Sequence, residues 1–115
     1  MATEVELDRL RNALVRDPSG ARLGKVCEIF LNDRTQKISF VTVALGPFGT
    51  REVYIPYEYI DLDNGVPHTA LNREILEAAP RANGLGHLTF TQEEQLRAYY
   101  EAAVVADPHH PSTHD

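Results

Sequence analysis

The stretch GARLGKVCEIF, residues 20–30, holds two glycines, a lysine and the only cysteine of the chain. A phosphate-binding P-loop needs four residues between its glycines, and a Ser or Thr after its lysine. Here only three residues separate Gly20 from Gly24, and Val26 stands where the hydroxyl should be. The residues that follow favour a strand, so no helix N-terminus would face an anion. We therefore predict that Gly20 closes a turn and that Gly24 marks a bulge or a close approach within a strand.

Cys27 lies in the middle of that predicted strand, between apolar residues. A nucleophilic cysteine needs a lowered pKa and a neighbouring base, and no histidine lies within 40 residues of Cys27 in the sequence. We expect a buried and inert thiol, because free cysteine usually packs as a small hydrophobic residue. A single cysteine also excludes a disulfide framework within the chain and fits a reducing cytosol.

Strand signals extend outward from this stretch as short apolar runs separated by turn residues. Residues 37–45, KISFVTVAL, are apolar on both faces of an extended chain, so we expect this strand to be buried on both sides. A small barrel fills its interior with one face only, so helices or a second chain must cover the other. The pattern predicts a mainly β fold, a small and strongly bent antiparallel β-barrel. The expected strand segments are 12–17, 23–32, 37–45, 51–55, 56–62 and 66–71.

A short helix is expected at about residues 73–79. Asn72 can cap it, Leu71 can pack against Leu76, and Pro80 stops it.

A longer C-terminal helix is expected at about residues 92–104, where Thr91 and Glu94 have the spacing of a capping box. A stripe at helical spacing provides its packing face, with Leu96, Tyr99, Tyr100 and Ala103. We divide the chain into a flexible lead-in with one turn of helix (1–11), the barrel with the short helix (12–80), a linker with the longer helix (81–106) and a disordered tail (107–115).

Charge and composition limit the possible functions. The 115 residues are 43% hydrophobic and carry a net charge of -6. This acidity argues against direct binding of nucleic acid, which needs a concentrated positive patch. No stretch approaches the ~20 apolar residues of a membrane span, and the first residues lack the blocks of a secretory signal. We therefore expect a cytoplasmic protein without a membrane span.

An aromatic cluster provides the most suggestive surface feature. In an alternating pattern Tyr57 and Tyr59 share one face, while Tyr54 points away from the face of Val53 and Ile55. Tyrosine suits interfaces because its apolar ring ends in a polar hydroxyl. Packing of a helix on the barrel within the same chain explains such a cluster equally well. The candidate interface residues are Phe48, Tyr54, Tyr57, Tyr59, Val41, Val43, Tyr99 and Tyr100.

The histidines and carboxylates give no catalytic arrangement. His68 and His87 stand alone in turn-like contexts, where a surface role is more common than metal ligation. Three histidines of the tail could bind a divalent metal only loosely, without packed supporting groups: His109, His110 and His114. No nucleophile, base and oxyanion donor can be assembled, so we expect no enzyme activity, no catalytic or metal-site residues and no cofactor.

Four segments, taken in order, resemble the PRC-barrel domain family. They are VRDPSGARLGKVCEIFLN (15–32), DRTQKISFVTVAL (33–45), REVYIPYEYI (51–60) and LNREILEAAP (71–80). The resemblance covers roughly residues 12–80, and residues 86–101 are similar to the C-terminal helix of stand-alone bacterial members. The family includes the cytoplasmic part of the photosynthetic reaction-centre H subunit and the C-terminal domain of the ribosome maturation factor RimM.

The resemblance implies a bent barrel that acts as an interaction module without shared catalytic residues. This sequence shows neither the transmembrane anchor of the H subunit nor the N-terminal domain of RimM, so neither function is carried over. We expect a non-enzymatic cytosolic adaptor that forms a homodimer. One alternative is an accessory factor in ribosome maturation that binds a ribosomal protein. Another is a small-molecule or metal-binding regulator that uses the barrel mouth or the tail.

Overall fold

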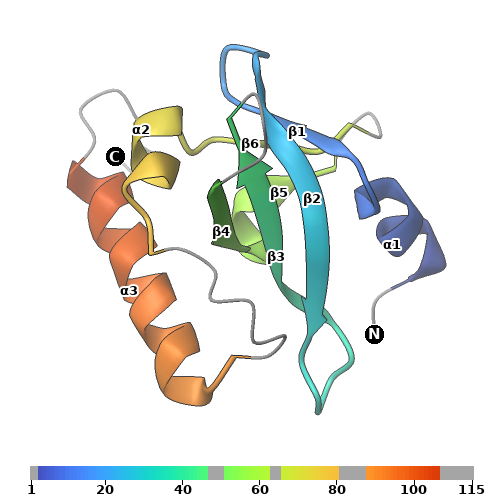
Figure 1. Cartoon of the computed structure of the whole chain (residues 1–115). Coiled ribbons are helices and arrows are strands. Elements are labelled where there is room, and N and C mark those ends of the chain that lie inside the picture. Colours follow the sequence, from blue (N-terminus) through green and yellow to red (C-terminus); the bar gives the residue numbers. More distant parts are fainter. Residues whose placement is uncertain (1–2, 47–50, 63–65, 81–87, 107–115) are drawn as a thin grey trace, which may run out of the picture.

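Six strands in the described part of the chain form one curled sheet, in the order β4-β3-β2-β1-β6-β5 (Figure 1). This computed structural model describes residues 3–46, 51–62, 66–80 and 88–106. The strands are β1 (Leu14–Arg16), β2 (Arg22–Leu31), β3 (Ile38–Leu45), β4 (Arg51–Pro56), β5 (Ile60–Asp61) and β6 (His68–Thr69). The helices are α1 (Glu4–Leu10), the 3-10 helix η1 (Tyr57–Tyr59), α2 (Arg73–Glu77) and α3 (Phe90–Ala106). The predicted mainly β fold with two C-terminal helices is confirmed.

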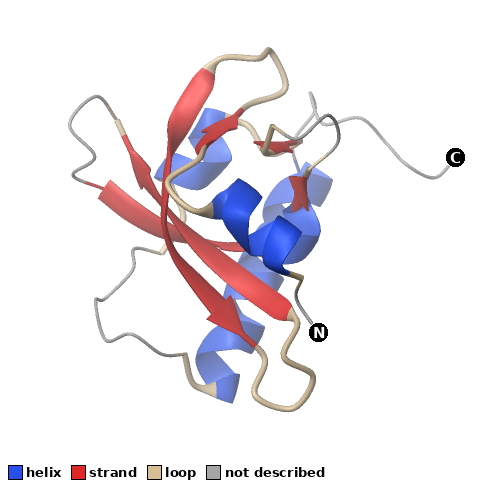
Figure 2. Cartoon of the chain, turned by 90° about the vertical axis from the view of Figure 1, so that its right-hand side faces the viewer, coloured by secondary structure: helices blue, strands red, loops and turns tan. Residues whose placement is uncertain are grey.

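The sheet curls strongly because a very short connection joins its two edge strands. β4 ends at Pro56, η1 takes up the next three residues, and β5 begins at Ile60. Edges linked by so few residues must lie close together, since each residue spans at most about 3.6 Å. The sheet is therefore bent toward a barrel, and Figure 2 shows α1 in front of the curl.

Neighbouring strands are antiparallel, as the sequence predicts, except for one pair. β1 and β6 run parallel, with Arg16 opposite His68. The backbone N–H of Arg16 donates to the carbonyl oxygen of Pro67 at 3.1 Å. β6 returns to β1 only after the chain has passed around the sheet, so no hairpin turn sets its direction.

The two glycines of the opening stretch have the structural roles that the sequence predicts. Gly20 closes the turn after β1, with a φ of 89°, and its N–H donates to the carbonyl oxygen of Asp17 at 2.9 Å. Gly24 lies where β2 crosses β3 closely. A Cβ atom at Gly24 would stand 2.0 Å from the carbonyl oxygen of Ala44. Only glycine allows the two backbones to approach this far.

β3 is buried on both faces, as its pattern of apolar residues predicts. One face carries Val41 and Val43 into the main core, with both side chains fully buried. The other face carries Phe40, which packs with Tyr54 of β4 and Leu96 of α3. α3 therefore supplies the cover that this second face needs, and Figure 1 shows the helix along that side of the sheet.

The N-terminal segment forms a seven-residue helix, longer than the single turn that the sequence indicates. The hydroxyl of Thr3 accepts from the N–H of Glu6, and the Glu6 carboxylate accepts from the N–H of Thr3, both at 3.1 Å. This capping box satisfies donors at the helix start. Leu10 at the other end is fully buried in the main core, so α1 is anchored to the barrel.

The two C-terminal helices lie close to their predicted positions. Asn72 caps α2 as predicted, because its side chain accepts from the N–H of Ile75 at 2.9 Å. The capping box predicted for α3 at Thr91 is wrong. Thr89 caps this helix instead, and the Thr89 and Gln92 side chains each accept from the other's N–H. Both threonines have the required spacing, and the earlier one lengthens the helix toward its N-terminus. None of the described helices could cross a membrane.

Candidate interaction groove

An open groove of about 920 Å³ lies where α1, η1, β5, β6 and the end of α3 come together. Its apolar lining comes from segments that are distant in sequence and comprises Pro18, Tyr57, Tyr59, Ile60, Leu62, Ala70 and Val104. Its polar lining comprises Glu6, Arg9, Glu58, Asp61, His68 and Thr69. A lining that combines apolar and polar side chains is the usual composition of a surface that binds another molecule.

Pro56 directs the two tyrosines into this groove. Its φ of -59° ends β4, and the chain continues as the 3-10 helix η1. The prediction that Tyr57 and Tyr59 share a strand face is wrong, because these residues are not extended. Both rings nevertheless line the groove, and both remain half-buried.

A hydrogen bond between Tyr57 and Glu6 ties η1 to α1 beside the groove. The Tyr57 hydroxyl donates to Oε2 of Glu6 at 3.0 Å. Burial and this bond to a carboxylate raise the pKa of Tyr57 to about 12. The pKa of Glu6 is lowered, first by the N–H of Thr3 and then by the Tyr57 hydroxyl. The pair therefore stays a neutral phenol and a carboxylate near neutral pH.

Contacts between polar side chains line part of the groove. His68 lies opposite Asp61 on β6 and β5, with 3.6 Å between Nε2 and Oδ2. Glu58 is paired with Arg97 of α3 at 3.0 Å, and the Arg97 guanidinium also lies over the Phe40 ring, 4.7 Å from its centroid. No sequence signal pointed to Arg97, because only the packing of α3 on the sheet brings it to these partners.

Most of the candidate interface residues are used inside the chain. Val41, Val43 and Tyr100 are fully buried, and Tyr54 is 4% exposed. The Tyr100 hydroxyl donates to the carbonyl oxygen of Tyr54 at 2.5 Å. Packing within the chain therefore accounts for these four residues. Tyr54 and Tyr100 join the sheet to α3, as the alternative left open by the sequence proposed, and Val41 and Val43 lie in the main core.

The remaining candidates differ in their positions. Tyr99 is half-buried, and its hydroxyl donates to the carbonyl oxygen of Ile75 in α2 at 2.6 Å. Phe48 lies outside the described residues. Of the candidate interface residues, Tyr57 and Tyr59 are the two that line the groove.

The prediction that Cys27 is a buried core residue is wrong. The register between β2 and β3 shifts between Val26 and Glu28, so Cys27 is the extra residue of a bulge and its side chain is exposed. Partial burial, followed by the charge of Glu52, raises the pKa of its thiol. A raised pKa leaves less thiolate at neutral pH, which is the opposite of what a nucleophile needs.

Metal-binding groups do not gather within the described ranges. No three His, Cys, Asp or Glu side chains there come close enough to hold one ion. His87 and the three tail histidines lie outside these ranges, so the hypothesis of a metal-binding tail stays a prediction.

The family of the chain follows from its sequence and agrees with this architecture. The family model described as the PRC-barrel domain matches residues 2–68, which is more than half of the chain. The chain therefore belongs to the PRC-barrel domain family. The matched region includes α1, the strands β1 to β5 and the first residue of β6. A search among curated proteins gave no match to the chain.

Proposed function

We propose that the chain is a non-catalytic adaptor that docks a segment of a partner protein in the groove between α1, η1 and β6. The groove is the observation that carries this proposal. It combines half-buried tyrosine rings with a polar rim, and its volume of about 920 Å³ suits a few side chains of a partner. Tyrosine contributes apolar contact and a polar tip with little loss of conformational freedom.

The charged groups around the groove support docking over catalysis. Glu6 and Glu58 are engaged by Tyr57 and Arg97, and His68 faces Asp61. Such groups hold the wall of the groove in place and give its rim a fixed pattern of polar atoms. The exposed thiol on β2, with its raised pKa, also gives no support for a nucleophilic mechanism.

The proposal places the protein in the cytoplasm, which a single unpaired cysteine supports. The proposal is compatible with a homodimer. The sequence argument for a dimer, an apolar second face of β3 that needs a cover, no longer requires one. α3 already covers the second face of β3 through Leu96, so a second chain is not needed there.

The test uses Ala70, which is exposed and lines the groove. Ala70→Arg would fill the groove without removing a core side chain. Ala78→Arg is the matched control, because Ala78 is equally exposed at the end of α2 and does not line the groove. Full-length protein and both variants would be used for affinity capture from the native host, with quantitative mass spectrometry.

We expect at least one protein to be captured by the unchanged chain and by Ala78→Arg, and to be lost with Ala70→Arg. Calorimetry with that purified protein should reproduce the difference. Equal capture by all three proteins would show that the groove is not the docking site. Chemical conversion of a captured molecule by the chain would contradict the non-catalytic assignment.

A further inference from the structure

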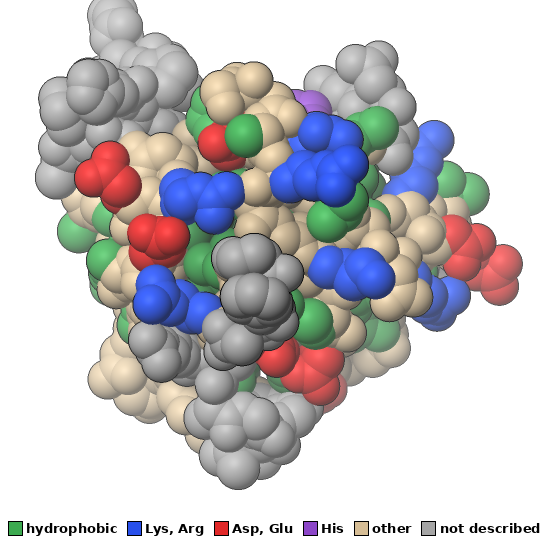
Figure 3. Space-filling model, turned by 45° about the horizontal axis from the view of Figure 1, so that its top comes forward, with side chains coloured by type: hydrophobic (Ala, Val, Ile, Leu, Met, Phe, Trp, Pro, Cys, Tyr) green, Lys and Arg blue, Asp and Glu red, His purple; other side chains and the backbone are tan. Residues whose placement is uncertain are grey.

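A second surface lies on the outer side of the β1–β2 hairpin, away from the buried side of Val15. We call it the basic face, and it consists of Arg16, Arg22 and Lys25. Arg16 lies opposite Arg22, and Leu14 lies opposite Lys25 in the register of the two strands. Residues opposite each other on adjacent strands point to the same side of a sheet, so the three cations share one face. Figure 3 shows Lys and Arg side chains gathered over this part of the molecule.

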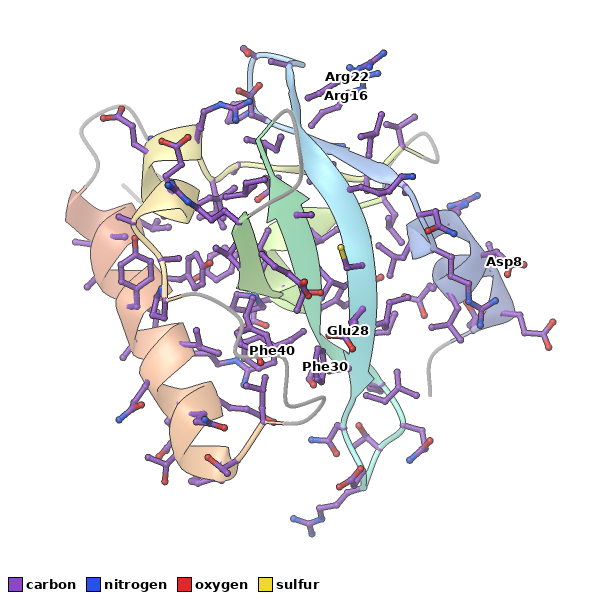
Figure 4. The ribbon with its side chains drawn as sticks, in the orientation of Figure 1. Asp8, Arg16, Arg22, Glu28, Phe30 and Phe40 are labelled. Carbon is purple, nitrogen blue, oxygen red and sulfur yellow. The ribbon has the colours of Figure 1, made fainter. Side chains whose placement is uncertain are left out.

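The two arginines form a like-charge pair directly across the strands. Such pairs destabilise a sheet, because directly opposite residues have their Cβ atoms only about 5 Å apart and like charges repel. Figure 4 shows the side chains of Arg16 and Arg22 close together and directed the same way. Within the described residues, none of the three cations of the basic face forms an ion pair. Across the described ranges, no ion pair therefore offsets the repulsion between Arg16 and Arg22.

Backbone carbonyls hold this arrangement in place. A guanidinium nitrogen of Arg16 donates to the carbonyl oxygen of Gly20 at 2.9 Å. Arg73 of α2 donates to the carbonyl oxygen of Arg22 at 2.6 Å, which brings a fourth cation to the hairpin. Neutral carbonyls orient these groups without cancelling their charge, so the positive charge stays available to a ligand.

The carboxylate of the hairpin itself belongs to the turn. Oδ1 of Asp17 accepts from the hydroxyl and the N–H of Ser19, at 2.7 and 2.9 Å, and from the N–H of Ala21 at 2.9 Å. The pKa of Asp17 is lowered, first by the bond from the Ser19 hydroxyl, and the charge of Arg73 contributes least. Asp17 therefore shapes the turn and leaves the basic face without a carboxylate partner of its own.

Other arginines of the same chain do have carboxylate partners. Arg97 is paired with Glu58 and Glu93, and Arg11 is paired with Asp8. Carboxylates outnumber cations in this sequence, whose net charge is -6. The basic face therefore concentrates three cations, without carboxylate partners in the described part of the chain, on one side of an acidic molecule.

We propose that the basic face binds a short acidic segment of a protein partner. Alternate side chains of an extended segment lie about 7 Å apart on one side, so two carboxylates can reach cations across and along the hairpin. Such a contact acts within a Debye length of about 8–10 Å, so the net charge of the molecule opposes it little. A nucleic acid or a membrane is a poorer occupant, because each needs a larger array of cations and meets the repulsion of the whole molecule.

The basic face is separate from the groove, so this inference goes beyond the proposed function and does not depend on it. The two surfaces nevertheless adjoin. Arg16 is the register partner of His68, which lines the groove. A partner that fills the groove could therefore extend an acidic end onto the basic face.

The test measures binding of a fluorescein-labelled hexaglutamate peptide by anisotropy, with the full chain at 25 and 150 mM NaCl. We expect binding that weakens as salt rises. Arg16→Gln/Arg22→Gln should weaken it about tenfold, because two exposed ion pairs of about 0.7 kcal/mol each are lost. Arg34→Gln/Lys37→Gln is the matched control, since both residues are exposed in the β2–β3 turn, and it should change the affinity less than about twofold.

Three outcomes would overturn the proposal. They are no binding of hexaglutamate at 25 mM NaCl, equal weakening by the two double variants, and tighter binding of a single-stranded 20-nucleotide DNA or of phosphatidylglycerol vesicles than of hexaglutamate.

A stability measurement separates loss of binding from loss of folding. Arg22→Gln removes one member of the like-charge pair and keeps the bond from Arg16 to the carbonyl of Gly20. We expect its thermal midpoint to stay equal or to rise at low salt, while its affinity for hexaglutamate falls. A lower midpoint together with unchanged affinity would mean that the pair serves the fold and not a ligand.

Discussion

Gly24 and Cys27 lie three residues apart on β2, yet the sequence predicted only one of them correctly. The role of Gly24 follows from the absence of a side chain, which the sequence states directly. The exposure of Cys27 depends on a bulge, which shifts the next three residues by one position relative to β3 before a second irregularity at Leu31 restores the register. The sequence prediction assumes that side chains alternate strictly between the two faces of a strand. One extra residue in a bulge breaks this alternation, so the thiol of Cys27 is assigned to the buried face although it is exposed.

The close approach at Gly24 leads to a prediction at this scale. Gly24→Ala would place a Cβ atom 2.0 Å from the carbonyl oxygen of Ala44, so the two strands would have to separate. We expect a loss of about 3 kcal/mol in the free energy of unfolding, measured by urea titration.

Gly20→Ala is the control for this change. Its backbone has a φ of 89°, but an added Cβ would meet no atom within 4 Å. We expect a loss of only about 1 kcal/mol from the left-handed conformation. Losses of equal size at the two glycines would contradict the close-approach explanation.

The positions of the helices and strands follow largely from local signals in the sequence. Asn72 caps α2 because its side chain lies at the right spacing, and such spacing can be counted along the chain. The start of α3 was misplaced since two threonines fit the same pattern. Neither the contact of α1 with η1 nor the position of Arg97 could be found, because each joins segments that only the tertiary fold brings together.

The contact of α1 with η1 gives a prediction with a pH dependence. Tyr57→Phe removes the hydroxyl that donates to Glu6 and should cost about 1 kcal/mol at pH 7, with allowance for solvent around the carboxylate. The folded pKa of Glu6 is lowered from 4.5, so its contribution is present above that value and is lost as the pH falls through the folded pKa. The difference between the two proteins should therefore vanish in acid, as urea titrations at pH 7 and at about pH 3 would measure.

A difference that persists unchanged at low pH would assign the effect to the Tyr57 hydroxyl itself and not to its bond with the ionised Glu6 carboxylate. Glu6→Gln changes the acceptor of the same bond. It should reduce the pH dependence of the free energy of unfolding over the same range, from pH 7 to about pH 3.

For the whole molecule, the sequence predicted a strand with two buried faces but could not say what covers the second one. Both a helix and a second chain satisfy the same apolar pattern. The structure answers this with α3, whose Leu96 packs on Phe40 and whose Tyr100 reaches the backbone of Tyr54. Some of the residues that the sequence pattern assigned to an interface therefore lie in the interior of a single chain.

The homodimer stays a prediction at this scale, and the groove is the surface that would carry it. Light scattering at micromolar concentration should give twice the 12.9 kDa mass of one chain. Ala70→Arg should then return the mass of a single chain, whereas Ala78→Arg should not. A clean single-chain mass for the unchanged protein would remove the dimer, while an adaptor for other proteins would remain possible.

The parallel contact of β1 with β6 has a consequence for the order of folding. Arg16 and His68 must meet across a loop of about fifty residues, and closing such a loop costs roughly 2 kcal/mol of chain entropy beyond that of a tight hairpin. The β1–β2–β3–β4 hairpins can form locally, so this pairing should form late and open first. The groove is built on the late-forming side, so native-state hydrogen exchange should show faster opening at Arg16 than at the central amides of β3. A partner that binds there would then select chains that have completed folding.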